Sequence, residues 1–256
     1  MPSISPPGAK VLFVVLSMPR TGSSMLTERL STHRAVRCFP AIFSATGWYD
    51  GRPTGRTGLM SWIRDNMDPE WEDQTRRITL PGKILQEILV KNTDKTAVGF
   101  KHHLSAPREI TNFVLGLQRR KILLTRNNYL AAYSSQKITE LTGQGAVRAQ
   151  PDATVIKARA HFDPDEFRAF CTNRETHYAE ARARAVGLTL EIDYVDARTE
   201  AGMARIAKFL KIDPRGFGPP KTAKRNSDNI ASRFQNRDDA LAYLREHDLE
   251  DWAKET

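Results

Sequence analysis

Residues 11–30 read VLFVVLSMPRTGSSMLTERL, an apolar run that passes through a short turn into an amphipathic segment. The run predicts a buried strand, and the segment after the turn predicts a helix. The turn, residues 19–24, combines one arginine, one glycine and several hydroxyl groups. Because the first N–H groups of a helix are unpaired and the helix dipole is positive there, this turn predicts an anion site.

The anion is not expected to be a nucleoside triphosphate held by a lysine and magnesium. The loop pattern G-x-x-x-x-G-K-[ST], which binds such nucleotides, occurs nowhere in the chain. A phosphate-like group that needs neither partner fits better. An ordinary serine-rich helix N-terminus without a ligand is the alternative interpretation of this turn.

Further apolar runs alternate with helical spacing along the chain. We expect strands at 11–17, 96–101, 121–125 and 188–194, and helices around 110–117, 167–181 and 203–210. This alternation predicts an α/β fold with a mainly parallel central sheet and helices on both faces. Ligands of such sheets bind at the carboxyl ends of the strands, where the turn 19–24 lies.

The length of 256 residues, without repeats or a long linker, predicts a single domain over 1–256. Within it, 1–9 is expected to be a flexible N-terminus, and 219–256 a basic C-terminal tail with a helix. Two irregular stretches, 41–58 and 139–161, are candidates for contacts with a substrate.

The chain is basic, with 39 Lys and Arg residues against 30 Asp and Glu and a net charge of +9. Charge alone fits nucleic acid, an acidic membrane surface or a phosphorylated small molecule. We do not expect nucleic acid as a partner, because the basic residues are scattered with few aromatic residues between them.

No apolar run is long enough to span a bilayer, and the two cysteines match no metal spacing. A cytoplasmic protein is therefore expected.

The stretch RNNYLAAYSSQKI follows the predicted strand at 121–125. It places Arg126 at the strand end and Ser134 about two helical turns later. The guanidinium can bind a phosphate through two N–H groups, and the hydroxyl supplies another donor. Both residues therefore predict a second anion site at the sheet edge that carries the turn 19–24.

Taken together, PRTGSSM, KHHL at 101–104 and the R-x7-S pattern of Arg126 and Ser134 resemble the sulfotransferases that use 3′-phosphoadenosine-5′-phosphosulfate, PAPS. The tail is also similar to those of bacterial carbohydrate and nodulation-type members. The resemblance implies a P-loop-like sulfotransferase fold that transfers a sulfuryl group to a hydroxyl or amine. The implied acceptor is a small molecule, carbohydrate or lipid; the implied product is 3′-phosphoadenosine 5′-phosphate, PAP, and no metal is implied.

The donor carries a phosphosulfate and a separate ribose phosphate, which matches the two predicted anion sites. By the resemblance, the phosphosulfate is held by Arg20, Thr21, Gly22, Ser23 and Ser24. The resemblance assigns the 3′-phosphate to Arg126 and Ser134, and the tail residues that add to this site are expected to be Lys221, Lys224 and Arg225. Arg20 is also expected to act in catalysis.

The resemblance places His103 at the family's catalytic histidine, with Lys101 as a further catalytic residue. Other members use a glutamate shortly after the first helix, where this sequence has Pro40 and Ala41. We therefore expect His103 to be the general base, with Asp50 in the loop 41–58 as the alternative.

Two other functions stay open. A metal-dependent nucleotide kinase of the related fold is disfavoured by the missing lysine, and a nucleotide-binding protein that has lost its activity remains an alternative.

His102 and His103 are neighbours on a strand, so their rings point to opposite faces and only one can serve the site. The identity of the acceptor and the oligomeric state do not follow from the sequence.

Overall fold

The structure of the protein is a computed structural model that describes residues 10–43, 59–144, 156–219 and 226–255. Its strands are β1 Val11–Ser17, β2 Val36–Phe39, β3 Ala97–His103, β4 Arg120–Thr125 and β5 Thr189–Asp193. They form one sheet in the order β2-β3-β1-β4-β5, and every neighbouring pair is parallel. The predicted parallel sheet is confirmed, and all four expected strands are present.

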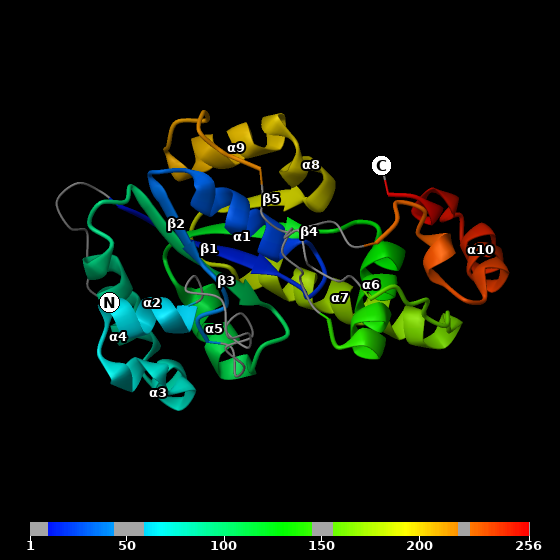
Figure 1. Ribbon diagram of the computed structural model, residues 1–256, viewed down its shortest axis with the longest axis horizontal. Coiled ribbons are helices and arrows are strands. Elements are labelled where there is room, and N and C mark those ends of the chain that lie inside the picture. The colour runs from blue at the N-terminus through cyan, green and yellow to red at the C-terminus, as the bar shows by residue number, and fades with distance from the viewer. Residues whose placement is uncertain (1–9, 44–58, 145–155, 220–225, 256) are drawn as a thin grey trace.

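The described helices are α1 Ser23–Thr32, α2 Leu59–Asn66, α3 Gln74–Thr79, α4 Pro81–Lys91, α5 Arg108–Gly116, α6 Tyr129–Thr142, α7 Pro164–Arg184, α8 Tyr194–Arg198, α9 Glu200–Leu210 and α10 Arg237–Glu246, with short 3-10 helices η1 Pro69–Glu72, η2 Ala231–Arg233 and η3 Glu250–Ala253. Figure 1 shows α8 and α9 above the sheet and α5 and α7 below it, so helices cover both faces as predicted. None of the described helices combines the length and apolar character needed to cross a membrane.

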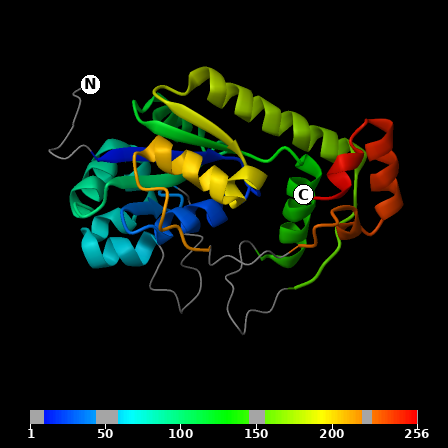
Figure 2. The same cartoon turned by 90° about the horizontal axis from the view of Figure 1, so that it is seen from above.

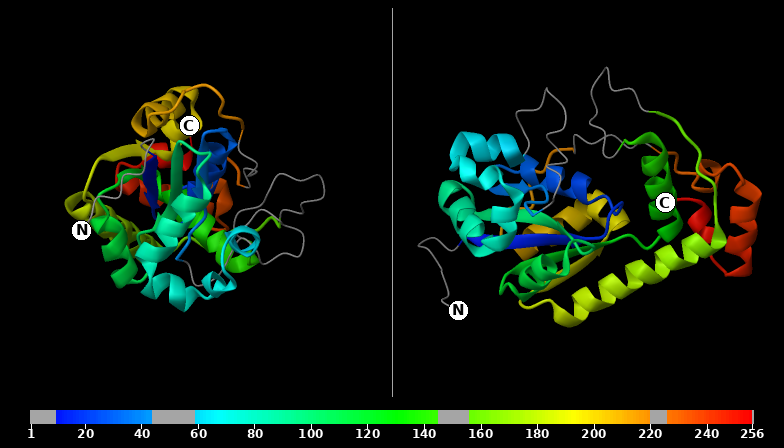
Figure 3. Two further views of the ribbon diagram at one scale, coloured as in Figure 1. Left: turned by 90° about the vertical axis from the view of Figure 1, so that its left-hand side faces the viewer. Right: turned by 90° about the horizontal axis from the view of Figure 1, so that it is seen from below.

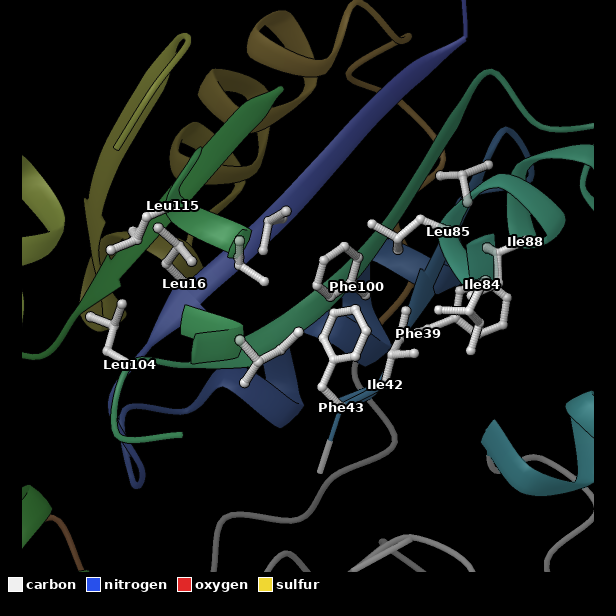
Figure 4. Packing of buried hydrophobic residues seen from close by; sticks show 14 of the residues in the cluster. Leu16, Phe39, Ile42, Phe43, Ile84, Leu85, Ile88, Phe100, Leu104 and Leu115 are labelled. Carbon is white, nitrogen blue, oxygen red and sulfur yellow. The ribbon is translucent and has the colours of Figure 1, made fainter. Parts of the chain in front are cut away.

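Side chains of β1 alternate between two cores, as the period of a strand requires. Phe13 and Val15 pack with Leu26 of α1 and with α9 on one face. Val14 and Leu16 pack with α4, α5 and α7 on the other face. Figure 4 shows this second core, in which the ring of Phe43 meets that of Phe100 edge-on, 5.6 Å between centroids.

Two sequence expectations need correction. The strand β2 and the helices α2 to α4 were not predicted, because VRCF has only four residues and the region after it lacks a long periodic pattern. The stretch 139–161 is not irregular from its start, because α6 continues to Thr142 and buries Ile138. Residues 145–155, within that stretch, lie outside the described part.

A third core joins α6 and the start of α7 to the C-terminal segment. Tyr133, Phe162 and Phe167 pack with Phe234 and with Leu244 of α10. Figure 2 and the right-hand view of Figure 3 show α10 beyond α6, away from the sheet. This packing fixes the predicted tail beside the carboxyl end of β4, where α6 begins.

A substitution at Gly99 of β3 tests the packing of the core on the α1 face. It pairs with Phe13 of β1, and a Cβ at Gly99 would lie 2.5 Å from two ring carbons of Phe13. We expect Gly99→Ala to lower the free energy of unfolding by about 1–3 kcal/mol, because the buried ring must move. Urea unfolding measures the change.

Gly82 of α4 provides the control, because nothing lies within 4 Å of a Cβ built there. Gly82→Ala should leave stability unchanged or raise it by up to about 1 kcal/mol through helix propensity. Equal losses in the two variants would show that the Phe13 ring does not cover Gly99.

Candidate functional site

The turn between β1 and α1 has an unusual backbone. Arg20 has φ 65° and Gly22 has φ 80°, both in the left-handed region. A Cβ at Gly22 would lie 2.3 Å from the ring of Tyr194, so the position requires glycine. The buried hydroxyl of Thr21 donates to the carbonyl of Met18 at 2.7 Å. The turn is thus held in a defined shape, and α1 begins directly after it.

Two cationic side chains flank this turn. Lys101 of β3 is buried, and its Nζ donates to Ser24 Oγ at 3.3 Å. The guanidinium of Arg20 donates from Nε and Nη2 to Ser135 Oγ, at 3.0 and 2.8 Å. Ser23 is buried at the first position of α1. The residues predicted to hold the phosphosulfate therefore include one positive side chain, Arg20, and contact a second, Lys101.

His103 lies on the same face of the sheet as Lys101. It pairs in register with Ser17 at the end of β1, two residues after Lys101. Burial lowers its pKa from 6.5 to about 3, and the nearby charges of Lys101, Arg20 and Arg174 add to this. The imidazole is consequently neutral at neutral pH and has a lone pair that can accept a proton.

His102 points to the opposite face, as the strand period predicts. Its Nε2 lies 3.0 Å from Thr111 Oγ1 on α5, and burial lowers its pKa to about 4. Of the two neighbouring histidines, the one on the side of the turn 19–24 is His103.

Arg174 of α7 is a site residue that the sequence analysis missed. Its side chain is among the largest fully buried ones, and Nη1 donates to the carbonyl of Pro19 at 2.8 Å. The guanidinium also lies 5.1 Å from the ring centre of Phe170. The helical spacing of α7 could have identified it. Position 174 lies on the apolar face that contains Phe167 and Tyr178, where an arginine is unexpected.

Arg126, the predicted second anion contact, lies beside the turn. Its Nη1 donates to the carbonyl of Arg20 at 2.8 Å, and its guanidinium lies 4.7 Å from the ring centre of Tyr194. Its remaining contacts are with a carboxylate: Nε donates to Glu255 Oε1 at 2.8 Å, and Nη2 donates to the same oxygen. No sequence pattern pointed to Glu255, which lies 129 residues further along the chain.

Ser134, the other residue of the predicted second anion site, contacts an arginine that the sequence analysis did not single out. Arg233 of η2 is buried, and its Nη1 donates to Ser134 Oγ at 3.1 Å. Two of its other N–H groups donate to the carbonyl of Ser227. Burial lowers the pKa of Arg233 to about 10, and the positive charge of Arg126 contributes. Arg126, Ser134 and Arg233 therefore form one basic cluster.

The tail residues Lys221, Lys224 and Arg225 and the alternative base Asp50 lie outside the described residues. Pro40 and Ala41, expected shortly after the first helix, directly follow the strand β2 that succeeds α1. In the described segments, no group of three or more His, Cys, Asp and Glu side chains could hold a metal ion.

Comparison with known proteins supports the fold. No protein-family model and no curated protein match the chain. The sulfotransferase domain of the olefin synthase from Synechococcus PCC 7002 aligns with a TM-score of 0.53 and 17% identity over 98% of this chain and 90% of that one. A sulfotransferase from Alicyclobacillus acidocaldarius aligns with a TM-score of 0.45 and 15% identity over 95% of this chain and 99% of that one. The likeness to the olefin synthase domain shows that the expected sulfotransferase fold is present.

We expect the free energy of unfolding to fall as the pH drops below 6.5. The unfolded chain protonates His102 and His103 near pH 6.5, whereas burial holds their folded pKa values at about 4 and about 3. The unfolded state then binds more protons, so stability is complete above pH 6.5 and is lost as the pH falls toward the folded values. Each histidine contributes up to about 1.4 kcal/mol per pH unit.

Urea unfolding at about pH 7 and about pH 5 measures this loss. His103→Asn should reduce it, and His161→Asn, at an exposed position, is the control. If His103→Asn leaves the loss unchanged, the imidazole is not shielded from water as the structure shows.

Proposed function

We propose that the protein is a PAPS-dependent sulfotransferase, which transfers a sulfuryl group to a hydroxyl or amine of a small-molecule acceptor. The observation that carries this proposal is the presence of two basic sites at one sheet edge. They are joined through Arg20, which borders the first site with its guanidinium and accepts a hydrogen bond from Arg126 of the second with its carbonyl. The fold shared with a sulfotransferase domain supports the proposal.

The two sites match the two anionic groups of the donor. The N-terminus of α1, with Arg20 and Lys101, would hold the phosphosulfate. Arg126 and Ser134, together with Arg233, would hold the 3′-phosphate. The contact between Arg126 and the carboxylate of Glu255 supports this assignment, because the same N–H groups of an arginine can bind a phosphate.

In the proposed reaction the acceptor oxygen forms a bond to sulfur. The bond between sulfur and the bridging phosphate oxygen breaks, and its electron pair remains on the 5′-phosphate of PAP. Lys101 and Arg20 stabilise the negative charge that develops there, as in phosphoryl transfer. His103 accepts the proton of the acceptor. The bound donor brings negative charge close to His103 and thereby raises its pKa from about 3 toward the range of an effective base.

A nucleotide-binding protein without transfer activity is the second candidate. The low pKa of His103 makes it a weak base before the donor binds, and Ala41 stands where related enzymes carry a glutamate. Turnover of PAPS separates the two candidates. Carbohydrates, lipids and other small hydroxyl compounds are the acceptor classes to screen.

PAP should raise the melting temperature in the presence of EDTA, and AMP should raise it much less, because the 3′-phosphate contacts exist only for PAP. In Arg126→Ala the advantage of PAP over AMP should fall by about 2 kcal/mol, the scale of a charge-assisted hydrogen bond. Calorimetric titration measures both affinities.

The difference between the two nucleotides is the appropriate measure, because Arg126→Ala also removes the partner of the buried Glu255 and alters stability. Arg198→Ala is the control, since this exposed arginine contacts the same Tyr194 ring at 5.5 Å. Equal shifts from PAP and AMP in the unchanged protein would argue against the 3′-phosphate site.

His103→Ala should lower the rate of sulfuryl transfer by about 10²- to 10⁴-fold, the usual contribution of a general base. PAP affinity should stay close to its original value. His102→Ala is the matched control: it loses the contact with Thr111 and should affect stability more than rate. If His103→Ala keeps most of its activity while Asp50→Asn abolishes it, the base lies in the loop 41–58.

A further inference from the structure

An anion that belongs to the chain itself occupies the second basic site. The Glu255 side chain is 1% exposed and that of Arg126 is 9% exposed, so their ion pair is almost fully removed from water. Both Nε and Nη2 of Arg126 donate to the same oxygen, Oε1. These are the N–H groups with which an arginine would grip a phosphate.

The backbone that carries Glu255 is anchored. The side-chain amide of Asn128 donates to the carbonyls of Trp252 and Lys254, at 3.1 and 3.0 Å. The N–H of Glu255 donates to the carbonyl of Asp228 at 3.0 Å. These bonds involve only the backbone of the tail segment, so they hold this segment in place independently of the contact between the Glu255 carboxylate and Arg126.

The charge balance favours a phosphate over this carboxylate. Arg233 belongs to the same basic cluster, and both Arg126 and Glu255 influence its pKa, so the carboxylate lies close to two guanidinium groups. One carboxylate neutralises only one of these charges. A phosphate monoester carries about −1.5 to −2 charges at neutral pH and has three terminal oxygens, so it can satisfy both arginines.

We propose that Glu255 is an internal competitor for the 3′-phosphate of the nucleotide and determines how strongly the site prefers a 3′-phosphorylated nucleotide. This inference rests on the proposed function. PAP must displace the Glu255 carboxylate, whereas AMP leaves it in place. The apparent affinity for PAP is then reduced by the fraction of molecules whose site is clear.

Calorimetric titration with PAP and with AMP, in EDTA, tests the proposal on Glu255→Gln. The substitution keeps the shape of the side chain and removes its charge. We expect PAP to bind at least about tenfold more tightly than to the unchanged protein, because a larger fraction of sites is clear, while AMP affinity stays the same. Glu250→Gln, an exposed glutamate of η3, is the matched control and should change neither affinity.

Two results would overturn the proposal in distinguishable ways. If Glu255→Gln binds PAP no more tightly while the unchanged protein still prefers PAP to AMP, Glu255 only stabilises the fold through its ion pair with Arg126. The proposed function then stands. If neither protein prefers PAP to AMP, the 3′-phosphate site itself fails, and the proposed function loses its main support.

Two further variants separate displacement of Glu255 from effects of the substitution on stability or on other contacts. Glu255→Asp keeps the charge on a shorter side chain and should give a smaller increase in PAP affinity, which decides the matter should the glutamine variant be too unstable. In the background of Arg126→Gln, the substitution Glu255→Gln should no longer improve PAP binding. An improvement that persists without Arg126 would contradict displacement from this arginine.

Discussion

The pairing of β1 with both β3 and β4 determines where the groups of the site lie. Ser17, the last residue of β1, is in register with His103 on one side and with Leu124 on the other. The three strands therefore end together, and the segments that follow them meet at one edge of the sheet. The turn 19–24 and Arg126 reach this edge directly from the strands that precede them.

The site that results is rich in buried positive charge. Burial lowers the pKa values of Arg174, Arg233 and His103, and the charge of a neighbouring cation contributes in each case. Carbonyl oxygens such as those of Pro19 and Ser227 replace part of the lost hydration. Like charges gathered out of water are costly unless an anion is present. An anion bound in this setting would offset part of that charge and so stabilise the folded protein.

The same setting explains the position of Glu255. A single internal carboxylate compensates part of the charge of Arg126 and Arg233 and so stabilises the site when no external anion is bound. Arg126 also links this contact to the carbonyl of Arg20 at the other basic site. Nucleotide selectivity and the stability of the ligand-free protein would then depend on one ion pair.

The sequence by itself determined four of the five strands, the helix after the turn, the glycine of that turn and the location of Arg126 at a strand end. These features follow from periodicity and turn chemistry within a few residues. Only the tertiary structure decided that Ser135 holds Arg20, that Arg233 reaches Ser134, and that the basic site already contains a carboxylate. The contacts of Arg174 with Pro19 and of Arg126 with Glu255 join segments 155 and 129 residues apart. No local pattern encodes such pairs, because they depend on how α6, α7 and the tail pack against the end of the sheet.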